Sequence, residues 1–283
     1  MRIAIASGKG GTGKTTVATN LAAVLAEDGR RVAYYDCDVE EPDGHIFLKP
    51  DITDRHPVHM LVPKVNMETC CFCGICAEIC RFRALAVLPD NVLVFPELCH
   101  GCGACTMLCP MRSIEESPRS IGTVSIGSGQ GVRFIEGRLD VGEAQAPPVI
   151  KAVKEVPSAD AEIRILDAPP GTSCPAMETV RGCDFVVLVT DSTPFGLHDL
   201  QLAAEMVRAL GLPQAVLINR SDGHDDDVVN FCTAHDMEIL ARIPDSRDTA
   251  VTYSRGEMPA LNDQLYREAI LKLFQAVMRR AVA

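Results

Sequence analysis

Nine residues near the start of the chain read Gly8-Lys9-Gly10-Gly11-Thr12-Gly13-Lys14-Thr15-Thr16. They follow a short apolar run, Ile3 to Ala6, and precede an apolar-periodic segment, Val17 to Leu25, so we expect a strand, a glycine loop and a helix. Backbone N–H groups of such a loop, with the positive end of the helix, bind phosphate oxygens, and glycines are needed because a Cβ would block the approach. Lys14 is then expected to reach the terminal phosphates, and Thr15 to bind Mg²⁺.

The same glycines, Gly8-x-Gly10-x-x-Gly13, also fit a dinucleotide-binding loop, with Asp36 near the position of a ribose-binding acid. Lys14 and Thr15 argue against that reading. A dinucleotide site has no use for a lysine and a hydroxyl directly after the last glycine, whereas a triphosphate with Mg²⁺ needs both. The loop therefore predicts a nucleoside triphosphate site.

Length and composition narrow the class of protein. A chain of 283 residues, 47% of them hydrophobic, can bury one large core together with a small satellite domain. The net charge of −11 and the lack of Trp argue against nucleic-acid binding. No apolar run approaches the ~18 residues of a membrane span, and no signal peptide is recognisable, so we expect a cytoplasmic protein. The 13 cysteines then indicate metal or redox chemistry rather than disulfides.

Acidic residues follow two of the expected strands. Val32 to Tyr35 leads into Asp36-Cys37-Asp38, and Ile163 to Leu166 leads into Asp167 and a Pro-Pro-Gly turn. In an open α/β sheet the carboxyl ends of strands face the ligand crevice. Asp38 is therefore a candidate to orient the attacking water, although a solvated acidic loop fits it as well on local sequence alone. Asp167 is expected to hold the Mg²⁺ shell, and the turn to present a backbone N–H to the γ-phosphate.

Eight cysteines form two runs of identical spacing. The runs are Cys70-x₂-Cys73-x₂-Cys76-x₃-Cys80 and Cys99-x₂-Cys102-x₂-Cys105-x₃-Cys109, and each cysteine of the second lies 29 residues after its counterpart. Such spacing wraps three thiolates around one iron–sulfur cluster while the fourth reaches the other cluster. The duplication predicts two 4Fe-4S clusters, with zinc as the alternative. Cys71 is a surplus thiol whose spacing to Cys73 is one residue short.

The loop Lys-Gly-Gly-x-Gly-Lys-Thr, from Lys9 to Thr15, resembles the deviant Walker A loop of the MinD/ParA ATPases, whose relatives include Mrp and the nitrogenase iron protein. Asp-x-Pro-Pro-Gly-Thr, from Asp167 to Thr172, resembles their switch II, and the cysteine runs resemble a bacterial two-cluster ferredoxin. The resemblance implies an α/β fold: a largely parallel P-loop sheet with helices on both faces (residues 1–61 and 117–283), plus an inserted small α+β ferredoxin domain (62–116).

The resemblance also implies an ATP-dependent homodimer in which Lys9 reaches the partner's nucleotide, Asp38 belongs to switch I, and Asn219 reads the base. As catalytic residues it suggests Lys9, Lys14, Asp38 and Asp167. The implied ATP site consists of Gly8, Lys9, Gly10, Gly11, Thr12, Gly13, Lys14, Thr15, Thr16, Pro170, Gly171, Asn219, Arg220, Pro244 and Asp245. The implied Mg²⁺ residues are Thr15, Asp38 and Asp167. The implied cluster ligands are Cys70, Cys73, Cys76 and Cys109 for the first cluster, and Cys80, Cys99, Cys102 and Cys105 for the second.

Other cysteines leave alternatives open. Cys174 follows Asp167 by seven residues, the offset of a cluster-ligating cysteine in the nitrogenase iron protein. It is either a ligand of a subunit-bridging cluster or a buried switch thiol. The ferredoxin-like pattern also departs from the usual one at Arg81, where a proline is expected, while Pro110 keeps it.

The remaining chain alternates strands and helices. We expect strands over 185–190, 214–218 and 238–241, helices over 196–210 and 226–234, and hairpins at 84–95 and 123–136. The second hairpin is either a plain connector or a partner surface. In the last helix, Ile270, Leu273, Phe274 and Val277 form a stripe that packs on the core or contacts a membrane peripherally.

Three functions fit these features. The first is an ATPase whose nucleotide-switched homodimer couples ATP to electron transfer with a redox partner protein. The second is an iron–sulfur carrier similar to Mrp, although the Cys-x-x-Cys pair which that family carries in its C-terminal half does not occur after Cys109. The third is a positioning ATPase similar to MinD, in which the clusters are only structural.

Overall fold

The computed structural model describes residues 1–281, and the chain divides into two compact units. The first unit comprises Met1–His56, Val124–Arg138 and Ile150–Ala283, and the second Pro57–Thr123 and Leu139–Val149. The chain leaves the first unit within strand β3 (Asp51–Val65) and re-enters it within strand β6 (Ile114–Gly129). The chain enters the second unit again for Leu139–Val149, so it passes between the units at four places.

The first unit is built on a nine-stranded sheet of order β11-β10-β9-β1-β8-β2-β7-β6-β3. From β11 to β7 every neighbouring pair is parallel. This confirms the expected α/β class with a largely parallel sheet. The strands are β1 (Arg2–Ala6), β2 (Val32–Asp36), β7 (Val132–Leu139), β8 (Ile163–Asp167), β9 (Phe185–Thr190), β10 (Gln214–Ser221) and β11 (Ile239–Pro244).

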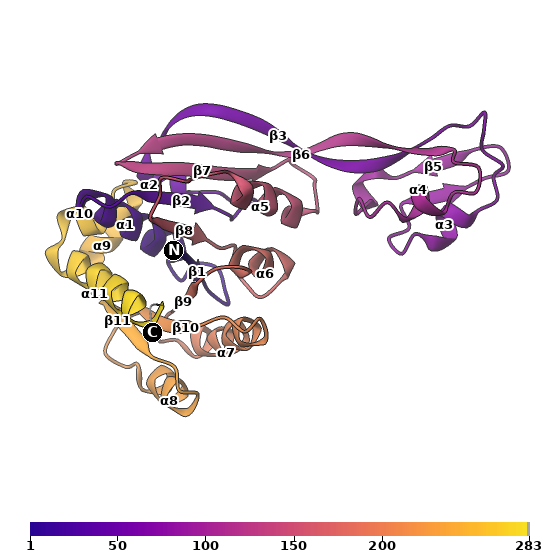
Figure 1. Ribbon diagram of the computed structural model, residues 1–283. Helices are drawn as coiled ribbons and strands as arrows, with labels where there is room; N and C mark the ends of the chain where they lie inside the picture. Colours follow the sequence, from indigo (N-terminus) through magenta and orange to yellow (C-terminus); the bar gives the residue numbers. More distant parts are fainter. Residues whose placement is uncertain (282–283) are drawn as a thin grey trace. The chain divides into compact units, whose positions relative to one another are not determined.

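Helices cover both faces of this sheet, which explains why its central strands are continuous apolar runs: all six residues of β9 are buried. One face carries α1 (Lys14–Glu27), α10 (Pro259–Asn262) and α11 (Gln264–Ala281); the other carries α5 (Ala146–Glu155), α6 (Cys174–Val180) and α7 (Pro194–Ala209) (Figure 1). The remaining helices of this unit are α2 (Gly44–Leu48), α8 (Asp226–Ala234) and α9 (Arg247–Ser254).

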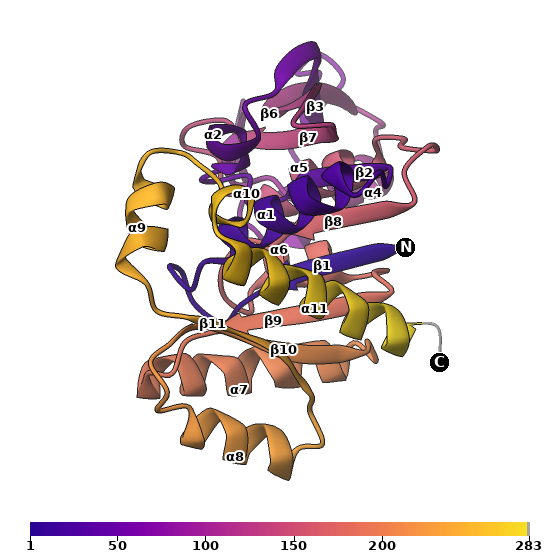
Figure 2. The ribbon, with the colours of Figure 1, turned by 90° about the vertical axis from the view of Figure 1, so that its left-hand side faces the viewer.

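The last helix, α11, packs beside α1 over the strands (Figure 2). Its predicted stripe, Ile270, Leu273, Phe274 and Val277, lies in the hydrophobic core of the first unit. The apolar side of this helix is therefore used in packing. Within residues 1–281, no helix is long and apolar enough to cross a membrane.

The predicted hairpin at 123–136 forms, but it is part of the main sheet. β6 and β7 are neighbours in that sheet and are joined by Gln130 and Gly131, whose φ angles of 52° and 74° suit a type I′ turn. β6 also begins nine residues earlier than the pattern at 123 indicates. Glycines allow the close approach of its far end: a Cβ on Gly127 would lie 2.3 Å from the carbonyl oxygen of Asp51.

The second unit repeats itself at the spacing of the cysteine runs. Helix α3 (Ile75–Ile79) corresponds to α4 (Ala104–Leu108), each preceded by a left-handed glycine. The N–H of Asn66 donates to Ser113 O at 2.7 Å, and the N–H of Phe95, its counterpart, donates to Ala84 O at 2.8 Å. The duplicated sequence thus folds as two equivalent halves. The unit also contains the antiparallel pair β4 (Leu85–Val87) and β5 (Val92–Val94), as predicted, and a 3₁₀ turn (Pro96–Leu98).

Candidate nucleotide site and cysteine cavities

The glycine loop joins β1 to α1 and leaves the helix N-terminus open. Gly13 precedes α1 with a φ of 91°, no side chain caps the helix, and its first turn holds no acidic residue. A Cβ on Gly10 or Gly11 would meet no atom within 4 Å, so free space lies beside the loop. Thr12 Oγ1 is buried without a hydrogen-bond partner among the described residues. These features suit an anion held by backbone N–H groups and the helix dipole.

Two residues from other parts of the chain pack closely against the loop. A Cβ on Gly8 would lie 1.9 Å from the carbonyl oxygen of Asp199 in α7, and a Cβ on Gly13 would lie 2.3 Å from Nδ2 of Asn219. The amide of Asn219, near the end of β10, donates to Thr12 O at 2.7 Å. The family resemblance implied that Asn219 reads the base. In this structure its side-chain amide positions the loop.

The acidic residues converge because β2 and β8 are parallel and in register, with Asp36 opposite Asp167. Both residues are fully buried. The hydroxyl of Tyr34 donates to Asp167 Oδ2 at 2.9 Å, and the N–H of Gly44 donates to Asp36 Oδ2 at 2.9 Å. Asp167 Oδ1 has no hydrogen-bond partner within residues 1–281. A buried carboxylate oxygen of this kind suits a cation such as Mg²⁺.

Burial of this acidic group shifts its protonation. Burial raises the pKa of Asp167 to about 7, against the opposing effects of Lys14 and the Thr15 hydroxyl. Burial likewise raises the pKa of Asp38 to about 6, although Lys14 lowers it. The pKa of Asp36 is raised by burial and then by the nearby Asp167. The structure thus brings Lys14, Thr15, Asp38 and Asp167 into one electrostatic group, in which positive charge is insufficient without a cation.

Lys9 is paired within its own chain. Its ammonium lies 2.9 Å from Asp191 Oδ2 and 3.3 Å from the hydroxyl of Thr193. Asp191 directly follows β9, and its pKa is lowered by the hydrogen bonds of Thr193 and Lys9 despite partial burial. The strand-end rule that identified Asp36 and Asp167 applies equally to Asp191, which the sequence analysis did not single out.

A cavity adjoins the loop at Gly11 and Gly13. Several of the predicted nucleotide residues meet there, and two tyrosines join them that sequence analysis did not identify, Tyr253 and Tyr266. The lining residues are Gly11, Gly13, Thr16, Asn219, Arg220, Ile243, Pro244, Asp245, Ser246, Thr249, Ala250, Tyr253 and Tyr266. Gly171 and Pro170 are not among them. The N–H of Gly171 donates to Ser7 O at 3.0 Å, so it would have to break that bond to meet a phosphate.

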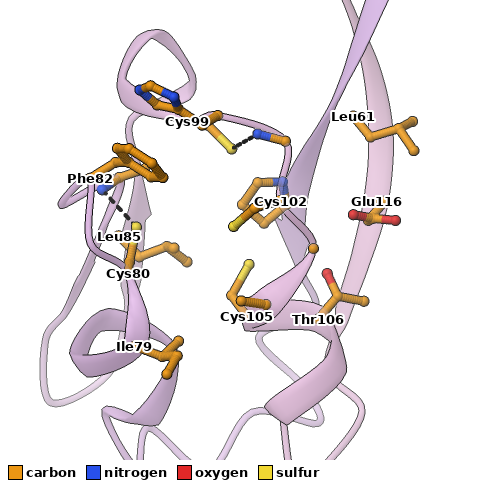
Figure 3. A pocket seen from close by; sticks show the side chains of 16 residues that line it. Leu61, Ile79, Cys80, Phe82, Leu85, Cys99, Cys102, Cys105, Thr106 and Glu116 are labelled. Carbon is orange, nitrogen blue, oxygen red and sulfur yellow. Dashed lines mark hydrogen bonds between the residues drawn. The ribbon is translucent and has the colours of Figure 1, made fainter. Parts of the chain in front are cut away.

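The eight cysteines of the two runs line two cavities in the second unit. The first cysteine cavity holds Cys70, Cys73, Cys76 and Cys109, with Cys71 also at its wall, and the second cysteine cavity holds Cys80, Cys99, Cys102 and Cys105. In the second cavity the four sulfur atoms face a common space between two chain segments (Figure 3). Each cavity thus combines three cysteines of one run with the fourth cysteine of the other.

Backbone N–H groups point at the sulfur atoms in the same way in both cavities. Phe72 donates to Cys70 and Gly101 to Cys99, each at 3.4 Å; Ala84 donates to Cys80 at 3.2 Å and Ser113 to Cys109 at 3.3 Å. Within the described part of the chain, no group of three or more His, Cys, Asp or Glu residues is arranged to hold a metal ion.

The cysteines outside the two runs differ in exposure. Cys183 and Cys232 are buried thiols. Cys174 is exposed at the first position of α6, so the alternative of a buried switch thiol is wrong. The offset of Cys174 from Asp167 in the sequence does not determine whether a residue at the start of a helix faces the solvent or the core. Cys71 is exposed.

Replacing Asp167 with Asn tests the effect of its buried charge. The pKa of Asp167 in the folded state is raised to about 7. The stability that this residue contributes is therefore present in full below its ordinary pKa of about 3.9, and it is lost as the pH rises through about 7. Asn remains neutral and still accepts from Tyr34. Without nucleotide and Mg²⁺, the Tm of Asp167→Asn minus that of the wild type should grow by about 2 °C or more between pH 5 and pH 8, by calorimetry. A difference independent of pH would contradict this.

Residues 3–260 match the CobQ/CobB/MinD/ParA nucleotide binding domain family. An uncharacterized protein of Methanocaldococcus jannaschii is 34% identical over 224 residues, 78% of each chain. An iron-sulfur cluster carrier protein of Pseudomonas fragi is 24% identical over 276 residues, 92% of this chain and 78% of that one. The septum site-determining protein MinD of Pyrococcus horikoshii, complexed with Mg-ADP, shares the fold with a TM-score of 0.59 at 20% identity, over 98% of this chain and 95% of that one. The chain belongs to the CobQ/CobB/MinD/ParA family.

Proposed function

We propose that this protein is a Mg²⁺-dependent ATPase that binds two 4Fe-4S clusters and couples ATP to electron transfer with a partner protein. One observation carries the proposal: a chain of this nucleotide-binding family also contains two equivalent cavities, each lined by four cysteines from both runs. A nucleotide site alone would need neither cavity.

In the nucleotide site, the loop amides and Lys14 bind the phosphates and neutralise the charge that develops during hydrolysis. Thr15 and Asp167 hold Mg²⁺, for which Asp167 Oδ1 is left without a protein partner among the described residues. Asp38 is half-buried beside Lys14 and orients the attacking water. Tyr34, which donates to Asp167, keeps that carboxylate in place.

In the second unit, the first cluster is held by Cys70, Cys73, Cys76 and Cys109, and the second by Cys80, Cys99, Cys102 and Cys105. Bound clusters would carry single electrons, and their reduction potentials would depend on net charge, hydrogen bonds to sulfur and solvent exposure. The four N–H donors to cysteine sulfur support this role, because they lie where they stabilise negative charge on thiolates. The cavities differ in their hydroxyls: Ser113 lines the first cavity and its counterpart at the second is Ala84, whereas Thr106 lines the second and its counterpart in the first run is Ala77.

The nucleotide-dependent step is dimer formation. Lys9 is held by Asp191 in the isolated chain. To reach a partner's nucleotide, the ammonium exchanges that carboxylate for phosphate oxygens. The exchange is favourable only when a triphosphate supplies the negative charge, which makes dimerisation depend on ATP.

A second candidate is an iron–sulfur cluster carrier. It is favoured by similarity to proteins of that name from Pseudomonas fragi, Deinococcus radiodurans and Synechocystis. The two matches other than Pseudomonas fragi cover only 14% and 16% of this chain, however. A carrier releases its clusters to an apoprotein, whereas an electron carrier retains them through repeated reduction. Iron retention after reduction and reoxidation therefore distinguishes the two.

Metal content tests the cluster proposal directly. Protein prepared without oxygen should contain about eight iron atoms per chain, since each complete cysteine set holds four. Cys73→Ala removes one ligand of the first cluster and should lower the count to about four. Cys71→Ala is the matched control: it removes a neighbouring exposed thiol outside the ligand set and should leave about eight. Iron and zinc are counted by plasma emission spectroscopy. Stoichiometric zinc without the visible absorption of 4Fe-4S clusters would refute the proposal.

Substitutions at Lys9 and Asp191 test the dimer. Lys9→Ala should bind ATP within about threefold of the wild type, because Lys14 and the loop amides remain, but lose ATP-driven dimerisation and most hydrolysis. Asp191→Asn removes the negative charge that holds Lys9 but keeps an oxygen that accepts hydrogen bonds from Thr193. This variant should dimerise at a lower ATP concentration than the wild type. Light scattering measures the dimer, and phosphate release the turnover. Normal dimerisation and turnover by Lys9→Ala would rule out the shared site.

A further inference from the structure

The cavity beside the glycine loop contains a buried hydroxyl with no assigned partner. Tyr266 lies on α11, about 250 residues from the loop in sequence, and contributes to the same lining as Gly11, Gly13 and Asn219. Its side chain is 3% exposed, and its Oη has no hydrogen-bond partner among residues 1–281. A buried hydroxyl without a partner is unfavourable, and a phenylalanine would fill the same space without that cost.

The charge state of this hydroxyl is fixed. Burial raises the pKa of Tyr266 above its ordinary value, and the nearby positive charge of Arg220 only partly offsets this. The group therefore stays a neutral phenol, which both donates and accepts one hydrogen bond. Arg220 lines the same cavity and holds a left-handed backbone, with a φ of 52°. A non-glycine residue in that conformation is uncommon and is found preferentially at functional sites.

Two other polar side chains of the cavity already have partners within the protein. Asn219, whose amide the family resemblance assigned to the base, uses Nδ2 to hold Thr12 O at 2.7 Å. Ser246 accepts from the N–H of Thr249 as the N-cap of α9. Tyr253 is 41% exposed, so its side chain is not sealed from solvent as that of Tyr266 is. Tyr266 is thus the deeply buried tyrosine of this cavity, and its hydroxyl has no hydrogen-bond partner among residues 1–281.

Since Gly11 and Gly13 mark the phosphate end of the site, the part of a nucleotide that reaches the tyrosines is its base end. We propose that Tyr266 is a specificity-determining residue whose hydroxyl hydrogen-bonds to the adenine base of the bound nucleotide. This inference rests on the proposed nucleotide site, and it concerns recognition rather than hydrolysis. A site built around such a bond rejects a base that leaves the buried hydroxyl unpaired.

The test uses the full chain with Mg²⁺ and three probes, ADP, 2′-deoxy-ADP and GDP, titrated by calorimetry. Diphosphates avoid turnover during the measurement. For Tyr266→Phe we expect ADP and 2′-deoxy-ADP to bind roughly fivefold more weakly, a loss typical of one hydrogen bond. GDP should change less, so that the preference for ADP over GDP decreases. The matched control is Tyr35→Phe, which removes a buried hydroxyl that donates to Ser158 Oγ outside this cavity and should leave all three affinities unchanged.

Each other outcome overturns the inference. Unchanged ADP affinity in Tyr266→Phe means that the tyrosine is only a core residue. A loss seen with ADP but absent with 2′-deoxy-ADP places the bond on the ribose instead. A lower Tm of nucleotide-free Tyr266→Phe means that the hydroxyl has a structural partner. Failure of the wild type to bind any of these nucleotides would instead refute the proposed function, which is a separate result.

Discussion

The buried ammonium of Lys14 is the charge around which the first unit is arranged. It lies at the positive end of α1, where the helix dipole adds to its charge, and it is only 6% exposed. A buried charge is tolerated only with partners, and Asp38, Asp43 and Asp167 supply them. These carboxylates arrive together because parallel strands end at one edge of the sheet. The surplus of negative charge that remains in the isolated chain is what makes the site suited to Mg²⁺ and phosphate binding.

The second unit depends on a different constraint, the repetition of one cysteine motif. The same positive-φ positions recur in both halves: Phe72 and Gly101, Gly74 and Gly103, Arg83 and Arg112. These turns aim backbone N–H groups at sulfur and direct four thiols into each cavity. The connection to the first unit runs through β3 and β6, and β6 leads into β7, which pairs with β2 and places Glu136 opposite Asp36. The chain therefore links the insert to the strand that carries the predicted switch I.

Local patterns predicted most of the parallel sheet, because each buried strand is a short apolar run with a polar residue at its carboxyl end. They also predicted the helix after the loop and the hairpin at Leu85–Val94. The length of β6 was missed, because its extension into 114–122 depends on pairing with β3 rather than on its own alternation. The contacts of Lys9 with Asp191 and of Tyr34 with Asp167 were missed for a related reason: in each pair the residues lie more than 130 positions apart, and no local spacing records such a contact.

The central claim is that nucleotide state and cluster properties are coupled. An anaerobic redox titration tests it most directly, performed on the wild type and on Asp38→Ala, each without nucleotide, with ADP and with ATP. The account predicts a nucleotide-dependent change in cluster potential of about 59 mV, a tenfold change in a one-electron equilibrium. Asp38→Ala should hold the potential that ATP favours, because hydrolysis no longer resets it. Identical potentials in all nucleotide states, together with identical rates of electron delivery to a partner, would contradict the claim and leave the clusters as structural elements of a nucleotide-dependent positioning protein.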